Sequence, residues 1–127
     1  MSIMAGGSIA ALPTAGQPFR LVSAASTNST LVKAGGTLLT GIWVSNINAA
    51  ICYLKLYDKA TAPTIGTDTP RLTLGVPGNA AGAGASLAIP GGCRFLLGLG
   101  LGLTTAPADA SVAAVLASEV VVSLVFV

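Results

Sequence analysis

Histidine is absent from this chain of 127 residues, and charged residues make up only 8% of it. An average soluble domain is about 25% charged. Without histidine, the chain lacks the commonest general base and the usual partner of a serine or cysteine nucleophile. The six basic residues are scattered singly and the net charge is only +2, so the sequence lacks the concentrated positive charge that binds nucleic acid. These absences argue against an enzyme and against a nucleic-acid-binding protein.

Carboxylates and cysteines are also few. Of the four carboxylates, Asp58 and Asp68 are the only two that flank one predicted loop. A glycosidase-like pair faces across a cleft, whereas aspartates in such positions usually bond to the backbone. We expect the structural role, with a weak calcium site as a less favoured alternative. Cys52 and Cys93 lack metal-ligand spacing, so no metal or cofactor is expected. We favour two buried free thiols, and a disulfide between Cys52 and Cys93 remains the alternative.

Long uninterrupted apolar segments are missing, although 53% of the residues are hydrophobic. A membrane-spanning helix needs about 20 mainly apolar residues. Ser111–Val127 is short and contains Glu119, and Phe95–Leu103 contains three glycines, which disfavour a helix. The first basic residue is Arg20, so no secretory signal is expected. The sequence therefore argues against a membrane protein.

Short alternating segments rich in β-branched and aromatic residues are what the sequence does contain. About eight of them recur at the spacing of a β-sandwich or barrel. They are Phe19–Val22, Thr30–Lys33, Thr37–Ile47, Ile51–Tyr57, Arg71–Val76, Ser86–Ile89, Cys93–Leu103 and Glu119–Val127. The Asn-rich turn between the third and fourth segments predicts a hairpin, and Gly91-Gly92 predicts a turn. Residues 1–18 predict an extended N-terminal arm, and residues 19–127 predict one β-sandwich domain.

Leucine and glycine alternate in Leu97–Leu103, so that Gly98, Gly100 and Gly102 share one face of the predicted strand. Glycine in a strand usually marks the close approach of another group. A bulky neighbour from the same chain, such as Trp43 or Phe95, is favoured over the backbone of another subunit, which remains the alternative. The three glycines are therefore candidate contact residues.

Trp43, Tyr53 and Tyr57 all belong to the predicted hairpin. Because aromatic residues dominate both cores and interfaces, one of these settings is favoured over a sugar-binding surface. Ten charged side chains are too few to cover a lone globule of this size, so part of the surface is expected to face another protein. The three aromatic residues, together with Asp58, Asp68 and the three glycines, are the candidate interface residues.

The segment Leu54–Leu74, LKLYDKATAPTIGTDTPRLTL, resembles a recurring element in small virion proteins of tailed bacteriophages. In those proteins, it follows a strand that ends in Ser-Asn, matched here by Ser45-Asn46. It precedes a Gly/Pro-rich loop and a Gly-Leu-Gly strand, matched by Gly91–Leu103. The similarity spans Ser26–Val127. This chain is richer in Gly and Ala than the pattern, which favours a capsid-bound protein over a fibre that projects into solvent.

The resemblance implies an antiparallel β-sandwich of jelly-roll type that decorates and cements a phage capsid. The protein is then made in the host cytoplasm and located on the capsid surface. Its implied partners are the major capsid protein and copies of itself, a trimer being favoured over a dimer because it matches local threefold positions of an icosahedral shell. Neither nucleic acid nor a membrane is an expected partner. The alternative is a receptor- or glycan-binding module of a head or tail fibre, with its site around Trp43, Tyr53, Tyr57 and residues 58–70.

Overall fold

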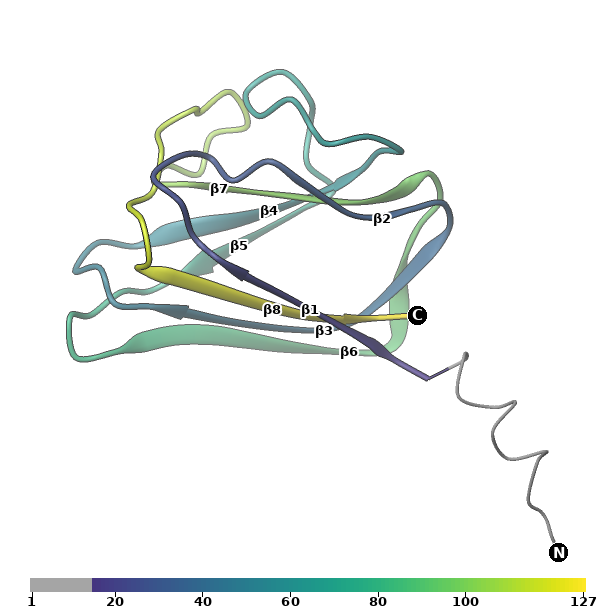
Figure 1. Ribbon diagram of the computed structural model, residues 1–127, viewed down its shortest axis with the longest axis horizontal. Coiled ribbons are helices and arrows are strands. Elements are labelled where there is room, and N and C mark those ends of the chain that lie inside the picture. Colours follow the sequence, from purple (N-terminus) through teal and green to yellow (C-terminus); the bar gives the residue numbers. More distant parts are fainter. Residues whose placement is uncertain (1–14) are drawn as a thin grey trace, which may run out of the picture.

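The computed structural model describes residues 15–127, and this part of the chain contains eight β-strands and no helix. The strands lie in two stacked layers (Figure 1). Their bounds are β1 (Gln17–Val22), β2 (Thr30–Ala34), β3 (Thr37–Asn46), β4 (Cys52–Asp58), β5 (Leu72–Val76), β6 (Ala83–Phe95), β7 (Gly98–Thr104) and β8 (Val120–Phe126). The predicted all-β fold of about eight strands is confirmed.

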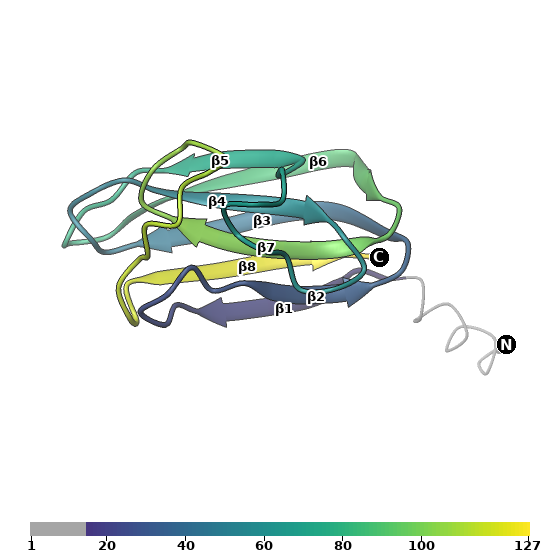
Figure 2. The same cartoon turned by 90° about the horizontal axis from the view of Figure 1, so that it is seen from above.

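Each layer is a four-stranded antiparallel sheet, ordered β1-β8-β3-β6 in one and β2-β7-β4-β5 in the other. Seen from above, β1 lies with β2 at one edge, and β6 lies with β5 at the opposite edge (Figure 2). Only the connection from β4 to β5 joins neighbours within a sheet, and every other connection crosses between the sheets. This order is the double Greek key of a jelly roll. The predicted jelly-roll sandwich is therefore confirmed.

The core lies between the sheets because successive side chains of a strand point to opposite faces and one face of most strands is apolar. Strand β7 contributes Leu99, Leu101 and Leu103, each with 0% exposure, and these pack with Val122 and Leu124 of β8. Burying one leucine side chain contributes about 1.5–3 kcal/mol. The apolar run around β7 is thus a core strand. Among residues 15–127, no helix is long and apolar enough to span a membrane.

The predicted hairpin between Thr37–Ile47 and Ile51–Tyr57 is wrong. Strand β3 pairs with β6 and β8, whereas β4 pairs with β5 and β7 in the other sheet. The connection between them crosses one end of the sandwich, where the Asn46 side-chain amide donates hydrogen bonds to the carbonyl oxygens of Ala50 (3.0 Å) and Val76 (3.2 Å). A turn signal shows that the chain reverses, but it does not show whether the two strands pair or face each other across the core.

Strand β6 is longer than predicted, because Gly91 and Gly92 form an irregularity inside the strand instead of a turn. Both glycines have positive φ, 79° and 80°. Opposite them, the register with β3 jumps between Leu39 and Gly41. A bulge bends a strand without ending it, and this one also breaks the alternation predicted for β3, since Leu39 and Ile42 are both buried.

The expected N-terminal arm overlaps the first sheet. Strand β1 begins at Gln17, and Gln17 and Pro18 lie opposite Phe126 and Val125 of β8. The paired part of the chain therefore starts two residues before the predicted strand Phe19–Val22. Residues 1–14 of the expected arm lie outside the described residues.

Candidate functional site

An exposed turn joins β6 to β7 and divides Cys93–Leu103, which the sequence predicts as one strand. Phe95 ends β6 and is fully buried, whereas Gly98 begins β7. Between them, Leu96 and Leu97 are 67% and 59% exposed. Turns usually carry glycine or polar residues, so two adjacent leucines at this end of the sandwich form an apolar projection. Leu96 and Leu97 are called the dileucine turn below.

The carboxylate of Asp58 holds the dileucine turn. Asp58 is the last residue of β4 and lies opposite Leu99 of β7, so its side chain is beside the turn. It accepts hydrogen bonds from the backbone N–H of Leu97 at Oδ1 (2.7 Å) and of Leu96 at Oδ2 (3.0 Å). The guanidinium of Arg71 donates a third, of 3.1 Å, to Oδ2. Hydrogen bonds to an ionised group are about twice as strong as neutral ones, so the turn is well anchored.

The environment of Asp58 keeps its side chain ionised. Burial raises the pKa of this carboxyl, but hydrogen bonds from the backbone N–H groups of Leu97, Leu96 and Gly98 and the charge of Arg71 lower it more. The net result is a pKa below the ordinary value of 3.8. Asp58 is therefore a charged backbone-capping residue at neutral pH, which matches the structural role expected from the sequence.

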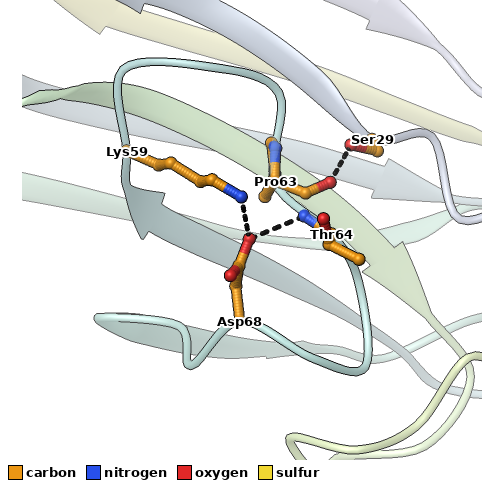
Figure 3. Close-up of polar contacts among 5 residues, drawn as sticks. All are labelled: Ser29, Lys59, Pro63, Thr64 and Asp68. Atoms are coloured by element: carbon orange, nitrogen blue, oxygen red, sulfur yellow. Dashed lines mark hydrogen bonds and ion pairs between the residues drawn. The ribbon is translucent and has the colours of Figure 1, made fainter.

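Asp68, the other member of the predicted pair, closes the β4–β5 loop (Figure 3). Its Oδ2 accepts hydrogen bonds from Nζ of Lys59 (2.6 Å) and from the backbone N–H of Thr64 (2.7 Å). Both hydrogen bonds lower the pKa of Asp68, and the one from Lys59 has the larger effect. The hydroxyl of Ser29 also donates a hydrogen bond to the carbonyl oxygen of Pro63 (Figure 3). The loop is thereby fastened to itself and to the segment before β2.

The formal net charge of the protein, +2, lies at the end that carries the dileucine turn. Four basic residues lie here on strand ends or in the adjoining loop, against the two carboxylates Asp58 and Asp68, which gives this end a net charge of +2. The basic residues are Lys33, Lys59, Arg71 and Arg94. The dileucine turn is therefore an apolar projection in positively charged surroundings.

The β4–β5 loop also covers the glycine face of β7. A Cβ atom at Gly100 would lie 2.9 Å from Cδ of Pro63, and one at Gly102 would overlap the side chain of Ile65. Gly98 is crowded by the backbone of two neighbouring segments. The group that approaches the glycines belongs to the same chain, as favoured from the sequence, but it is the β4–β5 loop and not Trp43 or Phe95. All three glycines are buried, so they do not lie on the surface of this chain.

The fold separates the three aromatic candidates. Trp43 is 50% exposed and lies on β3 of the first sheet, while Tyr53 and Tyr57 lie on β4 of the other sheet. Tyr57 is only 1% exposed. Neither Trp43 nor Phe95 covers the glycine face, because Phe95 is in the core and Trp43 is on the opposite sheet. The predicted glycan site that combined all three aromatic residues is therefore not formed as one surface.

Two polar residues, Lys55 and Tyr57, are buried under the loops, and Lys55 was not among the candidate residues of the sequence. Lys55 is fully buried, and its Nζ donates a hydrogen bond of 2.5 Å to the carbonyl oxygen of Ala108. The hydroxyl of Tyr57 is buried and has no hydrogen-bond partner among residues 15–127. Burial lowers the pKa of Lys55 and raises the pKa of Tyr57. The sequence did contain a sign of this burial. Gly102 and Gly100 of the neighbouring strand β7 lie opposite Lys55 and Tyr57 and leave room for a covering loop.

The two cysteines are free thiols on different sheets, Cys52 on β4 and Cys93 on β6. Cys52 is buried in the core, as expected for a thiol that acts as a small hydrophobic residue, whereas Cys93 is half-buried and packs against the core. Burial raises the pKa of Cys52 to about 11, so this thiol is unreactive at neutral pH. Residues 15–127 contain no group of three or more His, Cys, Asp or Glu side chains suited to hold a metal ion.

The fold and these sites define an eight-stranded jelly-roll sandwich with an anchored apolar turn at one end. Comparison with known proteins finds no matching family model, no matching curated protein and no matching solved structure.

Proposed function

We propose that this protein is a structural protein of a tailed-phage virion, which decorates and stabilises the capsid by binding the major capsid protein and copies of itself. The resemblance of Leu54–Leu74 to small virion proteins supports this role. So does the jelly-roll order of the strands, because viral capsid proteins commonly have this architecture. In this role the protein performs no catalysis and needs no cofactor.

The observation that carries the proposal is the dileucine turn held by Asp58. Its two leucines are exposed, yet their backbone is fixed by hydrogen bonds to a carboxylate. A contact that is already ordered loses little conformational entropy on binding. The turn therefore suits insertion into an apolar hollow of the capsid protein, and its basic surroundings suit an acidic rim around that hollow.

The energy available from one turn is modest. Full burial of an exposed leucine contributes about 1.5–3 kcal/mol, and the leucines of this turn are 67% and 59% exposed. One copy therefore gains roughly 2–4 kcal/mol from this contact. Linking several copies multiplies such contacts through effective concentration, so self-assembly is part of the proposal. A trimer matches the local threefold positions of a capsid.

The test is co-sedimentation of the purified protein with mature heads of the parent phage that lack it. We expect saturable pelleting and better survival of the heads on heating. The double variant Leu96→Ser/Leu97→Ser should weaken binding at least about tenfold, the equivalent of 1.4 kcal/mol. The matched control is Val112→Ser/Leu116→Ser, because these residues are 63% and 56% exposed in the β7–β8 connection, away from the turn.

Two outcomes count against parts of the proposal. If the wild-type protein stays in the supernatant as a stable oligomer, the capsid role is wrong. If the wild type pellets and the dileucine variant pellets equally well, the capsid role stands but the turn is not the contact.

A further inference from the structure

One outer face of the sandwich is covered by the chain itself, whereas the other is bare. The β4–β5 loop and the β7–β8 connection lie over the outer face of the β2-β7-β4-β5 sheet (Figure 1). On the opposite outer face, Trp43 is 50% exposed and borders an open hollow whose lining residues all belong to β3, β6 and β8.

The indole of Trp43 lies along this bare face. A Cβ atom at Gly41, two residues earlier on β3, would lie 2.8 Å from both Cη2 and Cζ3 of the ring. The missing side chain at Gly41 therefore provides the space in which the benzene part of the indole rests. The ring therefore extends along the strand towards Gly41, and the residue stays 50% exposed.

Serine residues flank the indole on both sides. The register places Ser123 of β8 and Ser86 of β6 directly opposite Trp43, and Arg20 of β1 lies beyond Ser123. Trp43, both serines and Ser45 line a shallow, open hollow of about 450 Å³. Small-molecule sites have volumes of about 300–1,000 Å³. Arg20 is the only charged side chain in this row of four residues.

The geometry points to this hollow as a binding site for a neutral pyranose sugar. A pyranose has an apolar face, whose C–H bonds suit the negative π face of an indole. Its rim carries hydroxyl groups, which pair with serine hydroxyls because these both donate and accept hydrogen bonds. Gly84 also lines the hollow. The centre of an interface with another protein is usually depleted of serine, and here three serines surround the indole.

Trp43 is the only tryptophan of the chain, so its fluorescence reports on this hollow alone. The experiment titrates the full chain with methyl β-D-glucopyranoside, methyl β-D-galactopyranoside and methyl N-acetyl-β-D-glucosaminide. We expect at least one of them to shift the emission saturably to shorter wavelength. A ligand of about 13 non-hydrogen atoms at ordinary ligand efficiency gives a Kd on the order of 1 mM.

Two variants test the geometry, with binding measured by calorimetry as well. In Gly41→Ala, the new methyl group displaces the indole, and in Ser86→Ala/Ser123→Ala the flanking hydroxyls are lost. Each variant should bind the sugar at least about fivefold more weakly, which corresponds to the loss of about one hydrogen bond. The serine variant keeps the test valid if Gly41→Ala folds poorly, which the melting temperature reports. Leu96→Ser/Leu97→Ser is the control and should bind sugar like the wild type, so the sugar site and the capsid role are tested separately.

The inference is overturned if none of the three sugars gives a saturable shift. It is also overturned if the serine variant binds sugar as tightly as the wild type. A shift of the emission with protein concentration alone, without any effect of sugar, assigns the face to contact with a second copy instead.

Discussion

Asp58 and Leu97 lie 39 positions apart in the sequence, yet a 2.7 Å hydrogen bond joins the backbone N–H of Leu97 to the Asp58 carboxylate. This bond connects the end of β4 to the turn between β6 and β7. The conformation of the dileucine turn thus depends on one carboxylate, that of Asp58, whose side chain is only 10% exposed. The same residue therefore links the stability of the fold to the presentation of the dileucine turn.

Replacing Asp58 by Asn should destabilise the protein. The amide of Asn keeps one acceptor oxygen, but its NH₂ group cannot accept a hydrogen bond from the second backbone N–H of the turn. The charge attraction to Arg71 is also lost. Hydrogen bonds to charged groups are worth about 1.5–3 kcal/mol, so we expect a loss of about 2 kcal/mol in the free energy of unfolding, measured in urea. The control is Thr61→Ala at an exposed position of the β4–β5 loop, which should change stability by less than about 0.5 kcal/mol. Equal effects of the two variants would contradict the anchoring role.

Acid should destabilise the protein through Asp58 and Asp68. Both carboxyls have a pKa in the folded state below the ordinary value of 3.8. A group whose pKa is lowered by folding stabilises the protein above its unfolded pKa, and this contribution is lost as the pH falls through the folded pKa. For these two groups, the free energy of unfolding should be level from about pH 7 to 5 and fall below about pH 4. Urea denaturation of the wild type and Asp58→Asn at each pH checks this, because the variant should lose less stability in acid. A variant curve as steep as that of the wild type argues against it.

Alkali should destabilise the protein through Cys52. Folding raises the pKa of this buried thiol from 9.0 to about 11. Above about pH 9 the unfolded chain loses the proton while the folded protein retains it, so stability falls as the pH rises towards 11. This difference corresponds to at most roughly 3 kcal/mol. Cys52→Val removes one ionisable group from the core and should lessen the alkaline decline in urea denaturation, to which the raised pKa of Tyr57 also contributes. Cys93→Val, the control, should keep the full decline. Persistence of the full decline in Cys52→Val would assign it to other groups.

The glycines of β7 should not tolerate a side chain. Gly102→Ala places a methyl group against Ile65, and Gly100→Ala places one 2.9 Å from Cδ of Pro63. Overpacking of this kind costs about 1–3 kcal/mol, which thermal or urea unfolding measures. Gly75→Ala is the matched control, because its Cβ would have its nearest atoms at ordinary distances of 3.5 and 3.6 Å. The control should be neutral or slightly stabilising, since alanine restricts the unfolded chain. If Gly100→Ala, which meets the rigid ring of Pro63, proves as stable as the control, the β4–β5 loop does not rest on the glycine face.

Local pattern located most of the strands of this protein, although it missed the turn inside Cys93–Leu103 and the bulge in β6. Alternating side chains determine which residues form a strand and which of its faces is buried, and these are properties of neighbouring residues. Trp43 and Ser45 were therefore placed correctly on the face opposite Ile42 and Val44. The same pattern placed Leu99, Leu101 and Leu103 on one face of a strand, and the structure buries that face in the core. The functional role proposed for the chain comes from a resemblance and not from these patterns.

The pairing of strands and the contacts of the sites depend on tertiary structure. A short turn after β3 is compatible both with a hairpin and with a crossing to the second sheet, and the jelly roll adopts the crossing. For the same reason, Trp43 and Tyr57 lie on different sheets although they share one predicted hairpin. The anchoring of Leu97 by Asp58 and the cover of Gly102 by Ile65 join residues distant in sequence. The sequence by itself determined where most strands lie, because their alternation is local. Only the folded chain decided which faces are covered and which turn is exposed, because those contacts form between segments that the pattern does not connect.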